Sequence, residues 1–279
     1  MTFNRWSKAW VIITLGALMA FDVRWLYGVI ISVYQISIGV RAASWWRFWL
    51  DYTLTGLVGD VVRLLGVCLA FYAVYLVWGH RHESFLGVRK FVSVAVLCEA
   101  VYFLTLTPIT LIEGARGVFP LLMAGYLLQI LLVSPPLIAL SVKIWRYTES
   151  ARAEVVKWAA IAGTFYLAGI WVNNVFRWVG ITDIGSLFSG TTAFGFLDTL
   201  ATLSLAVAFA AAGTHDLIKD GNQIRSMKLF AFALVMVGLA FALFVRYSAV
   251  TGTLVYAVLV EIWPVTLLGL GLSMLKTEK

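Results

Sequence analysis

The sequence predicts an all-α integral membrane protein, an eight-helix transmembrane bundle with both termini in the cytoplasm. Its 279 residues are 62% hydrophobic and only 13% charged, whereas an average soluble domain is nearer a quarter charged. The apolar residues gather into eight blocks, each long enough to cross a bilayer, for which about 20 helical residues are needed. The basic residues alternate between the gaps that join these blocks. Lipid as the solvent accounts for the apolar composition, and the alternation gives an orientation.

The eight blocks form a single polytopic membrane domain over residues 1–279, and no soluble domain is expected because every gap is short. The first block is long enough to tilt strongly or to break near Asp22. We expect Ser134-Pro135-Pro136 to interrupt the fourth block, because proline removes a backbone donor. The expected spans, in chain order, are roughly 9–35, 54–78, 91–112, 119–143, 156–178, 187–212, 228–246 and 250–275.

Basic residues in the gaps orient the bundle. The gaps on the side of the N-terminus hold 14 Lys and Arg residues and the opposite gaps hold five. Because cytoplasmic loops carry the excess of positive charge, this asymmetry predicts a multi-pass protein of the plasma membrane with both ends inside. In chain order the gaps hold Arg5 and Lys8; Arg41 and Arg47; Arg81, Arg89 and Lys90; Arg116; Lys143, Arg146, Arg152 and Lys157; Arg177; Lys219, Arg225 and Lys228; Arg246; and Lys276 and Lys279.

The first outer gap is rich in tryptophan. Trp45, Trp46 and Trp49 lie beside Arg47 and Asp51. Aromatic rings and charges in this mixture favour a helix that lies on the outer leaflet, at about residues 40–52. A lid or a partner-docking surface is the functional alternative, and the aromatic density does not separate the two.

Three acids are expected near the middle of the membrane and are candidates for binding an ion or a proton: Glu99, Asp198 and Glu261. A charged side chain inside the hydrocarbon costs at least about 2.5–3.5 kcal/mol on insertion scales, so such residues normally face the bundle interior and have a partner. The alternative is that each acid is a hydrogen-bonded contact between helices without a functional role.

A second polar set is expected in the outer half of the bundle, above the three acids, where it would form an Arg-rich vestibule suited to an anionic group. Simpler interpretations exist for some members. Asp60 and Arg63 are i,i+3 neighbours that would pair with each other, and Arg177 and Arg246 would extend to outer headgroups. The set comprises Asp22, Arg24, Asp60, Arg63, Asn173, Asn174, Arg177 and Arg246.

Prolines near two of the midplane acids strengthen the case for an ion site. Pro108 lies nine residues after Glu99, and Pro264 lies three after Glu261. Broken helices near midplane acids form ion and substrate sites in transporters. A plain kink is the alternative for each proline.

Several classes of function are excluded by the sequence. No nucleotide-binding, serine-hydrolase or zinc-protease motif is present, and the two cysteines and three histidines lack metal-ligand spacing within any span. No catalytic residue, metal or cofactor is therefore expected. The net charge of +7 does not indicate nucleic-acid binding, because the basic residues are dispersed over short loops.

Three functions remain compatible with this pattern. The first is a small ion- or proton-coupled transporter or channel-like protein, whose solute would be a small ion or an anionic small molecule. The second is a non-catalytic membrane subunit or receptor that anchors partner proteins, or a homo-oligomer. The third is a membrane-embedded enzyme acting on a lipid headgroup or phosphate, against which stands the lack of any evident nucleophile.

Overall fold

The regular structure of the chain is helical wherever the structure describes it. The computed structural model describes the backbone of residues 5–79, 84–117, 120–181, 190–249 and 254–276, and the side chains of these residues except 180–194 and 244–261. The helices are α1 (Arg5–Ser37), α2 (Trp45–Arg47), the π-helix η1 (Phe48–Val58), α3 (Gly59–Trp78), α4 (Phe85–Thr105), α5 (Thr107–Ala115), α6 (Pro120–Trp145), the 3₁₀ turn η2 (Glu149–Ala151), α7 (Arg152–Ile181), α9 (Gly190–Lys219), α10 (Gln223–Ala249) and α11 (Leu254–Leu275).

Seven described helical segments are long and apolar enough to cross a membrane. They coincide with the first seven predicted spans, so the described helices suit a multi-pass membrane protein. The last predicted span coincides with α11, whose apolar stretch with described side chains, Ile262–Leu275, is shorter than a full crossing. The count of eight crossings therefore stays a prediction.

Large apolar side chains cover the outside of the bundle. Leu65 is 51% exposed, Leu131 is 67% exposed and Phe165 is 42% exposed, and all three lie well inside long helices. Exposed apolar surface on this scale is unfavourable in water, whereas a hydrocarbon solvent accepts it without cost. The outer faces of the helices therefore suit contact with lipid.

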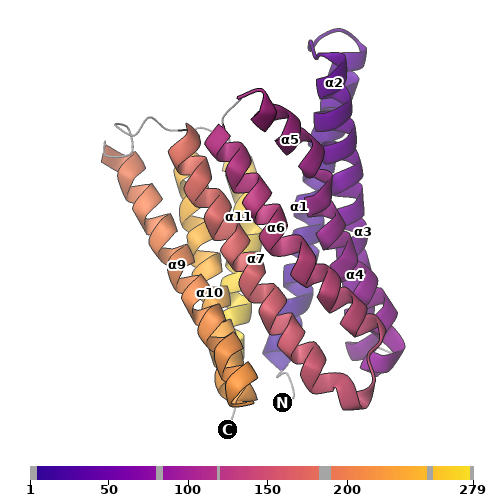
Figure 1. Ribbon diagram of the computed structural model, residues 1–279, viewed down its shortest axis with the longest axis vertical. Helices are drawn as coiled ribbons and strands as arrows, with labels where there is room; N and C mark the ends of the chain where they lie inside the picture. Colours follow the sequence, from indigo (N-terminus) through magenta and orange to yellow (C-terminus); the bar gives the residue numbers. More distant parts are fainter. Residues whose placement is uncertain (1–4, 80–83, 118–119, 182–189, 250–253, 277–279) are drawn as a thin grey trace.

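The long helices form a closed ring. Each packs on the one before it in the chain, in the order α1, α3, α4, α6, α7, α9, α10 and α11, and α11 then packs on α1. Figure 1 shows neighbouring helices running up and down in alternation, as short connections between antiparallel helices require. A ring built in this way has an interior that is bounded by helices on every side.

Both described ends of the chain lie at the same end of the ring. The Ser273 hydroxyl, near the end of α11, lies 3.3 Å from the Ser7 hydroxyl, near the start of α1. Figure 1 shows these helix ends at the bottom of the view. We call this the basic end, because its loops and helix ends carry most of the described Lys and Arg residues. They are Arg5, Lys8, Arg89, Lys90, Lys143, Arg146, Arg152, Lys157, Lys219, Arg225, Lys228 and Lys276.

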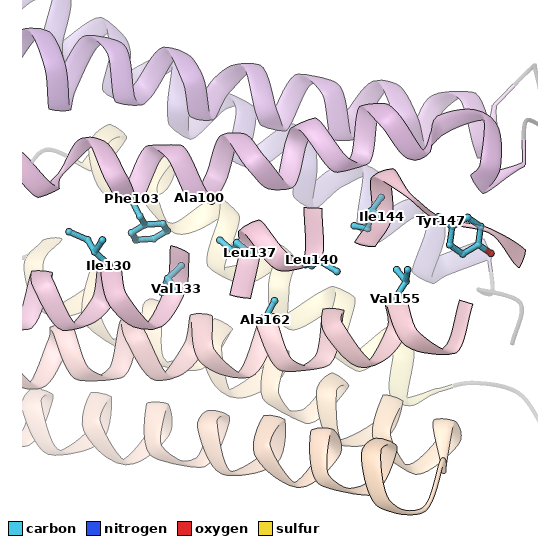
Figure 2. Packing of buried hydrophobic residues seen from close by; sticks show 10 residues of the cluster. All are labelled: Ala100, Phe103, Ile130, Val133, Leu137, Leu140, Ile144, Tyr147, Val155 and Ala162. Atoms are coloured by element: carbon cyan, nitrogen blue, oxygen red, sulfur yellow. The ribbon is translucent and has the colours of Figure 1, made fainter. Parts of the chain in front are cut away.

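A cluster of buried apolar side chains joins α4, α6 and α7. Residues of α6 such as Val133 and Leu137 form a row between Phe103 of α4 and Ala162 of α7 (Figure 2). Small residues allow the helices to approach closely. A Cβ atom added at Gly169 of α7 would lie 2.5 Å from a methyl carbon of Val133, so this glycine sets the distance between α6 and α7.

A buried pair of serines also joins α4 to α6. The Ser93 hydroxyl donates to the Ser141 carbonyl at 2.8 Å, and the Ser141 hydroxyl donates to the Ser93 carbonyl at 2.9 Å. Interhelical hydrogen bonds in membrane proteins contribute about 0.6 kcal/mol on average. The pair fixes the register of the two helices at this level of the membrane.

Three expectations about breaks in the helices have different outcomes. The chain breaks at Pro108, where α4 ends at Thr105 and α5 begins at Thr107, since proline fits the first turn of a new helix. The predicted interruption at Ser134-Pro135-Pro136 was wrong, because α6 continues through both prolines. Neighbouring helices re-satisfy freed carbonyls in such cases. The first span is also unbroken at Asp22.

The predicted interfacial helix at about 40–52 is not a separate element. Residues from Trp45 to Trp78 form one continuous helical segment of 34 residues, with η1 as its second section. Ending a helix within lipid would expose unpaired carbonyls and amides, so continuation is favoured. The aromatic segment therefore caps the hairpin of α1 and α3 (Figure 1), where the Arg116 guanidinium lies 4.1 Å from the Trp46 ring centre.

Candidate functional site

Four helices of the ring bring five polar side chains together in its interior. The Arg63 Nε atom lies 3.4 Å from an Asp22 carboxylate oxygen and 3.8 Å from a Glu99 carboxylate oxygen. The Tyr166 hydroxyl donates to Glu99 at 2.8 Å, and the Arg63 guanidinium lies 5.0 Å from the Tyr102 ring centre. We call Asp22, Arg63, Glu99, Tyr102 and Tyr166 the central charged group.

Helix geometry explains why these residues meet. Asp22 on α1, Arg63 on α3, Glu99 on α4 and Tyr166 on α7 lie between 14 and 17 residues from the ends of their helices at the basic end. At 1.5 Å per residue this corresponds to about 21–26 Å, so the four lie at one level. The positions of these residues within their spans predicted Glu99 in a layer beneath Asp22 and Arg63, and the structure instead unites the three.

Burial of the group is deepest at Asp22. The side chain of Asp22 is 3% exposed, that of Arg63 is 21% exposed and that of Glu99 is 24% exposed. One carboxylate oxygen of Asp22, Oδ2, is buried and has no hydrogen-bond partner among the residues that the structure describes. A buried carboxylate oxygen without a partner is costly, and a bound proton or cation would remove that cost.

Charge balance in the group is uneven. Two carboxylates pair with one guanidinium, so Asp22, Arg63 and Glu99 together carry one net negative charge when both acids are ionised. An uncompensated charge deep inside a membrane protein costs several kcal/mol. Binding one proton or one monovalent cation would neutralise the group. The arrangement is therefore suited to reversible binding of a single positive charge.

Asp60 and Arg24, both predicted members of the outer set, are not in the ion pairs that Arg63 forms with Asp22 and Glu99. Asp60 was expected to pair with Arg63 three residues later, but the Arg63 guanidinium points to α1 and α4 instead, and no described basic atom lies within 4.0 Å of the Asp60 carboxylate. Arg24 is half-buried on α1. It lies two residues after Asp22, so the two side chains point in different directions from the helix.

The remaining outer residues lie toward the end of the ring opposite the basic end. Asn174 and Arg177 line a small cavity of about 90 Å³ between α7, α9 and α10. The buried carbonyl oxygen of the Asn173 side chain has no hydrogen-bond partner among the described residues. The side chain of Arg246 lies outside the described residues. The structure thus brings Asn174 and Arg177 together, and it does not place them with Asp22 or Arg63.

The other two predicted midplane acids are not part of the central charged group. Asp198 on α9 is half-buried, and it forms no ion pair with another described residue. The side chain of Glu261 lies outside the described residues. Within the described part of the chain, no three His, Cys, Asp or Glu side chains cluster as a metal site would need.

Sequence reasoning missed the two tyrosines of the group. Tyr166 and Tyr102 lie within apolar spans, where a phenol was counted as part of the apolar pattern. A phenolic hydroxyl deep in a membrane needs a hydrogen-bond partner, and this requirement was the available signal. Tyrosine hydroxyls in the middle of a span are thus candidates for a buried polar site, as acids are.

A larger cavity opens at the basic end. It has a volume of about 540 Å³ and lies between α7 and α10, with contributions from α1, α9 and α11. Cavities of this size hold small organic ligands in other proteins. The ring interior therefore has an accessible opening on the side where the basic residues gather.

Comparisons with protein-family models, with curated proteins and with solved structures returned no match. The central charged group and the two cavities are therefore the features that bear on function.

Proposed function

We propose that this chain is a small ion- or proton-coupled transporter or channel-like protein, and that the proton is the coupling ion. The observation that supports this proposal is the central charged group, in which the buried carboxylate of Asp22 and the partly buried carboxylate of Glu99 share one arginine inside a closed ring. Groups of this kind in membrane spans mark ion pathways and proton relays. The unpartnered oxygen of Asp22 is the site that would accept the proton.

Arg63 would couple the proton to a change in structure. With both acids ionised, the guanidinium is shared between Asp22 and Glu99. Protonation of either acid removes half of this attraction, and Arg63 would then move toward the acid that stays ionised. Since Asp22 is on α1 and Glu99 is on α4, the exchange changes which helices are drawn together. A two-state packing change of this kind is what alternating access requires.

The orientation follows from the distribution of basic residues. The basic end would face the cytoplasm of a plasma membrane, with both termini inside. The opposite end would then face outward, and the Asn174 and Arg177 cavity there would favour an anionic small molecule. Asp198 and Glu261 stay candidates for further ion binding, and Arg24, Asp60, Asn173 and Arg246 stay candidates for the outer vestibule.

A non-catalytic subunit or receptor is the second candidate, and one observation favours it. Trp45 is 77% exposed and Trp49 is 50% exposed, at the tip of the hairpin of α1 and α3. Exposed aromatic residues are typical of interaction surfaces. A partner protein or a second copy of the chain would be held there, and the central charged group would then serve only to hold helices together.

Proton entry into proteoliposomes tests the proposal. The purified chain is reconstituted with an entrapped pH-sensitive dye, and a potassium diffusion potential drives protons inward. Methanesulfonate, phosphate and decanesulfonate are supplied together as trial anionic solutes. We expect entry above that of empty liposomes, and a loss of at least about tenfold in Asp22→Asn and in Glu99→Gln.

A matched control is Glu154→Gln, which removes an acid from an exposed ion pair with Lys143 at the basic end. This variant should transport protons as the parent does. Equal proton entry in the parent, Asp22→Asn and Glu99→Gln would remove the central charged group from the mechanism. A parent that behaves as empty liposomes do would favour the subunit.

A further inference from the structure

The cavity at the basic end is the mouth of the ring interior. Its walls are α7 on one side and α10 on the other, and Leu217 of α9 lies between them. Ser7 of α1 and Met274 of α11 line it as well. Because α7, α9, α10, α11 and α1 are consecutive members of the closed ring, the cavity lies inside the ring, away from surrounding lipid.

This cavity extends toward the central charged group. Along α7 it is lined from Arg152 to Gly163, a distance of about 16 Å at 1.5 Å per residue. Gly163 is three residues before Tyr166, which is about one helical turn. A Cβ atom added at Gly163 would meet nothing within 4 Å. The inner part of the cavity is therefore open space, one helical turn from Tyr166, whose hydroxyl donates to Glu99.

The chemistry of the lining is apolar within and positive at the opening. Arg152 of α7 and Lys228 of α10 lie on its two walls, and none of the described lining residues is acidic. Apolar side chains make up most of the rest of the lining. They are Val156, Ala159, Ala160, Leu217, Ile224, Met227, Phe230 and Met274.

One buried polar atom in the lining lacks a partner. Ser226 is 2% exposed and lines the cavity, and its hydroxyl oxygen has no hydrogen-bond partner in the described part of the chain. Buried hydroxyl groups are nearly always paired in folded proteins. This hydroxyl is covered by the wall, so recognition of a ligand rests on the apolar lining and on the two basic residues.

We propose that this cavity binds a single-chain amphipathic anion, with its charged head between Arg152 and Lys228 and its apolar body directed toward Gly163. The inference rests on the proposed function and deepens it, since it names the substrate class and the side of entry. A simple inorganic anion would leave the apolar walls unfilled, and a cation would be repelled at the opening.

Photolabelling with an alkyl sulfonate tests this site. The chain is placed in nanodiscs of zwitterionic lipid and labelled with a diazirine-bearing decanesulfonate, and labelled residues are mapped by mass spectrometry. We expect labels on α7 and α10 at the lining residues. Unlabelled decanesulfonate should compete, whereas methanesulfonate, decanol and decyltrimethylammonium should compete at least about tenfold less well.

Two variants test the geometry. Gly163→Leu places a side chain in open space within the cavity, and it should reduce labelling at least about tenfold. Gly28→Leu is its matched control, because Gly28 also has nothing within 4 Å of an added Cβ atom and does not line the cavity. The double variant Arg152→Gln with Lys228→Gln should weaken binding about tenfold, and Lys219→Gln should leave it unchanged.

Particular outcomes would overturn the inference. Labels that avoid α7 and α10, unchanged labelling in Gly163→Leu and in the double variant, or equal competition by decanol or methanesulfonate would each do so. If proton entry is retained but decanol or methanesulfonate competes as well as decanesulfonate does, the proposed substrate class is wrong and the proposed function stands. Confirmed binding together with proton entry that is equal in Asp22→Asn, Glu99→Gln and the parent would instead contradict the proposed function.

Discussion

Replacing Arg63 with glutamine should be the most destabilising polar substitution in the described part of the bundle. Arg63→Gln keeps a hydrogen-bonding side chain of similar length but removes the positive charge. Asp22 and Glu99 would then share no cation, so whichever acid stays ionised would have no counter-charge. The loss in the free energy of unfolding measures the contribution of the central charged group, because the guanidinium lies between acids from two different helices.

The size of the effect follows from the two distances. Ion pairs at 3.4 Å and 3.8 Å correspond to about 5 and about 4 kcal/mol at an effective dielectric constant of about 20. Desolvation of the three groups offsets much of this attraction. Removing one partner of a buried pair costs about 3–5 kcal/mol, because a charge is left uncompensated. We expect a loss in this range for the free energy of unfolding of Arg63→Gln.

A double-mutant cycle separates the ion pair from general damage. Equilibrium unfolding is measured by titrating dodecyl sulfate into mixed micelles, for the parent, Arg63→Gln, Asp22→Asn and the variant with both substitutions. The double variant should lose about 2–3 kcal/mol less than the sum of the single losses, since it removes both partners of the pair between Arg63 and Asp22. Arg47→Gln is the control, because the exposed pair with Asp51 should contribute about 0.5 kcal/mol or less.

Strict additivity in this cycle would refute the reasoning. So would a loss in Arg63→Gln no larger than that in Arg47→Gln. Either result would mean that the guanidinium is held by something other than the two carboxylates.

Three further predictions concern the same region and its supporting helices. Tyr166→Phe removes the hydroxyl that donates to Glu99 at 2.8 Å, and it should lower the free energy of unfolding by about 1.5–3 kcal/mol and reduce proton entry. Gly169→Ala places a Cβ atom against α6, and it should lower unfolding stability in the same titration by about 1–3 kcal/mol. Ser93→Ala removes half of the bonded pair with Ser141, and it should cost about 0.6–1.7 kcal/mol by that measure.

Each of these predictions has a matched control. Tyr126→Phe alters a tyrosine of α6 for which no side-chain hydrogen bond to a described residue is seen, and it should leave stability near that of the parent. Gly163→Ala lies on the same helix as Gly169 and meets open space, so it should not destabilise. A Ser93→Ala loss that persists in the Ser141→Ala background would contradict the paired hydrogen bonds.

Hydropathy and charge predicted the helices well because both are read along the chain. The end of α1 at Ser37 and the end of α3 at Trp78 fall within two residues of the predicted limits. Lipid requires continuous helices across the hydrocarbon core, so few other structures were available. The same requirement explains the errors, because α6 continues through its two prolines and the aromatic segment at Trp45 continues into α3.

Residues that meet across helices were harder to predict. Arg63 was assigned to Asp60 because the two are neighbours on one helix. Its actual partners are set by the rotation and tilt of α1 and α4, which depend on packing between helices. Small residues such as Gly66, where an added Cβ would lie 2.8 Å from that of Cys98, determine this packing. Their effect on neighbouring helices is absent from the hydropathy pattern.

Infrared difference spectroscopy of the central charged group tests the main claim most directly. A protonated carboxylic acid has a carbonyl stretching band that a carboxylate lacks. With two acids and one arginine, the parent should show one such band at neutral pH, and the band should disappear in Asp22→Asn and also in Glu99→Gln, because each variant leaves a balanced pair. A spectrum without a protonated carboxyl band that responds to either substitution would contradict the proposal that this group binds the coupling proton.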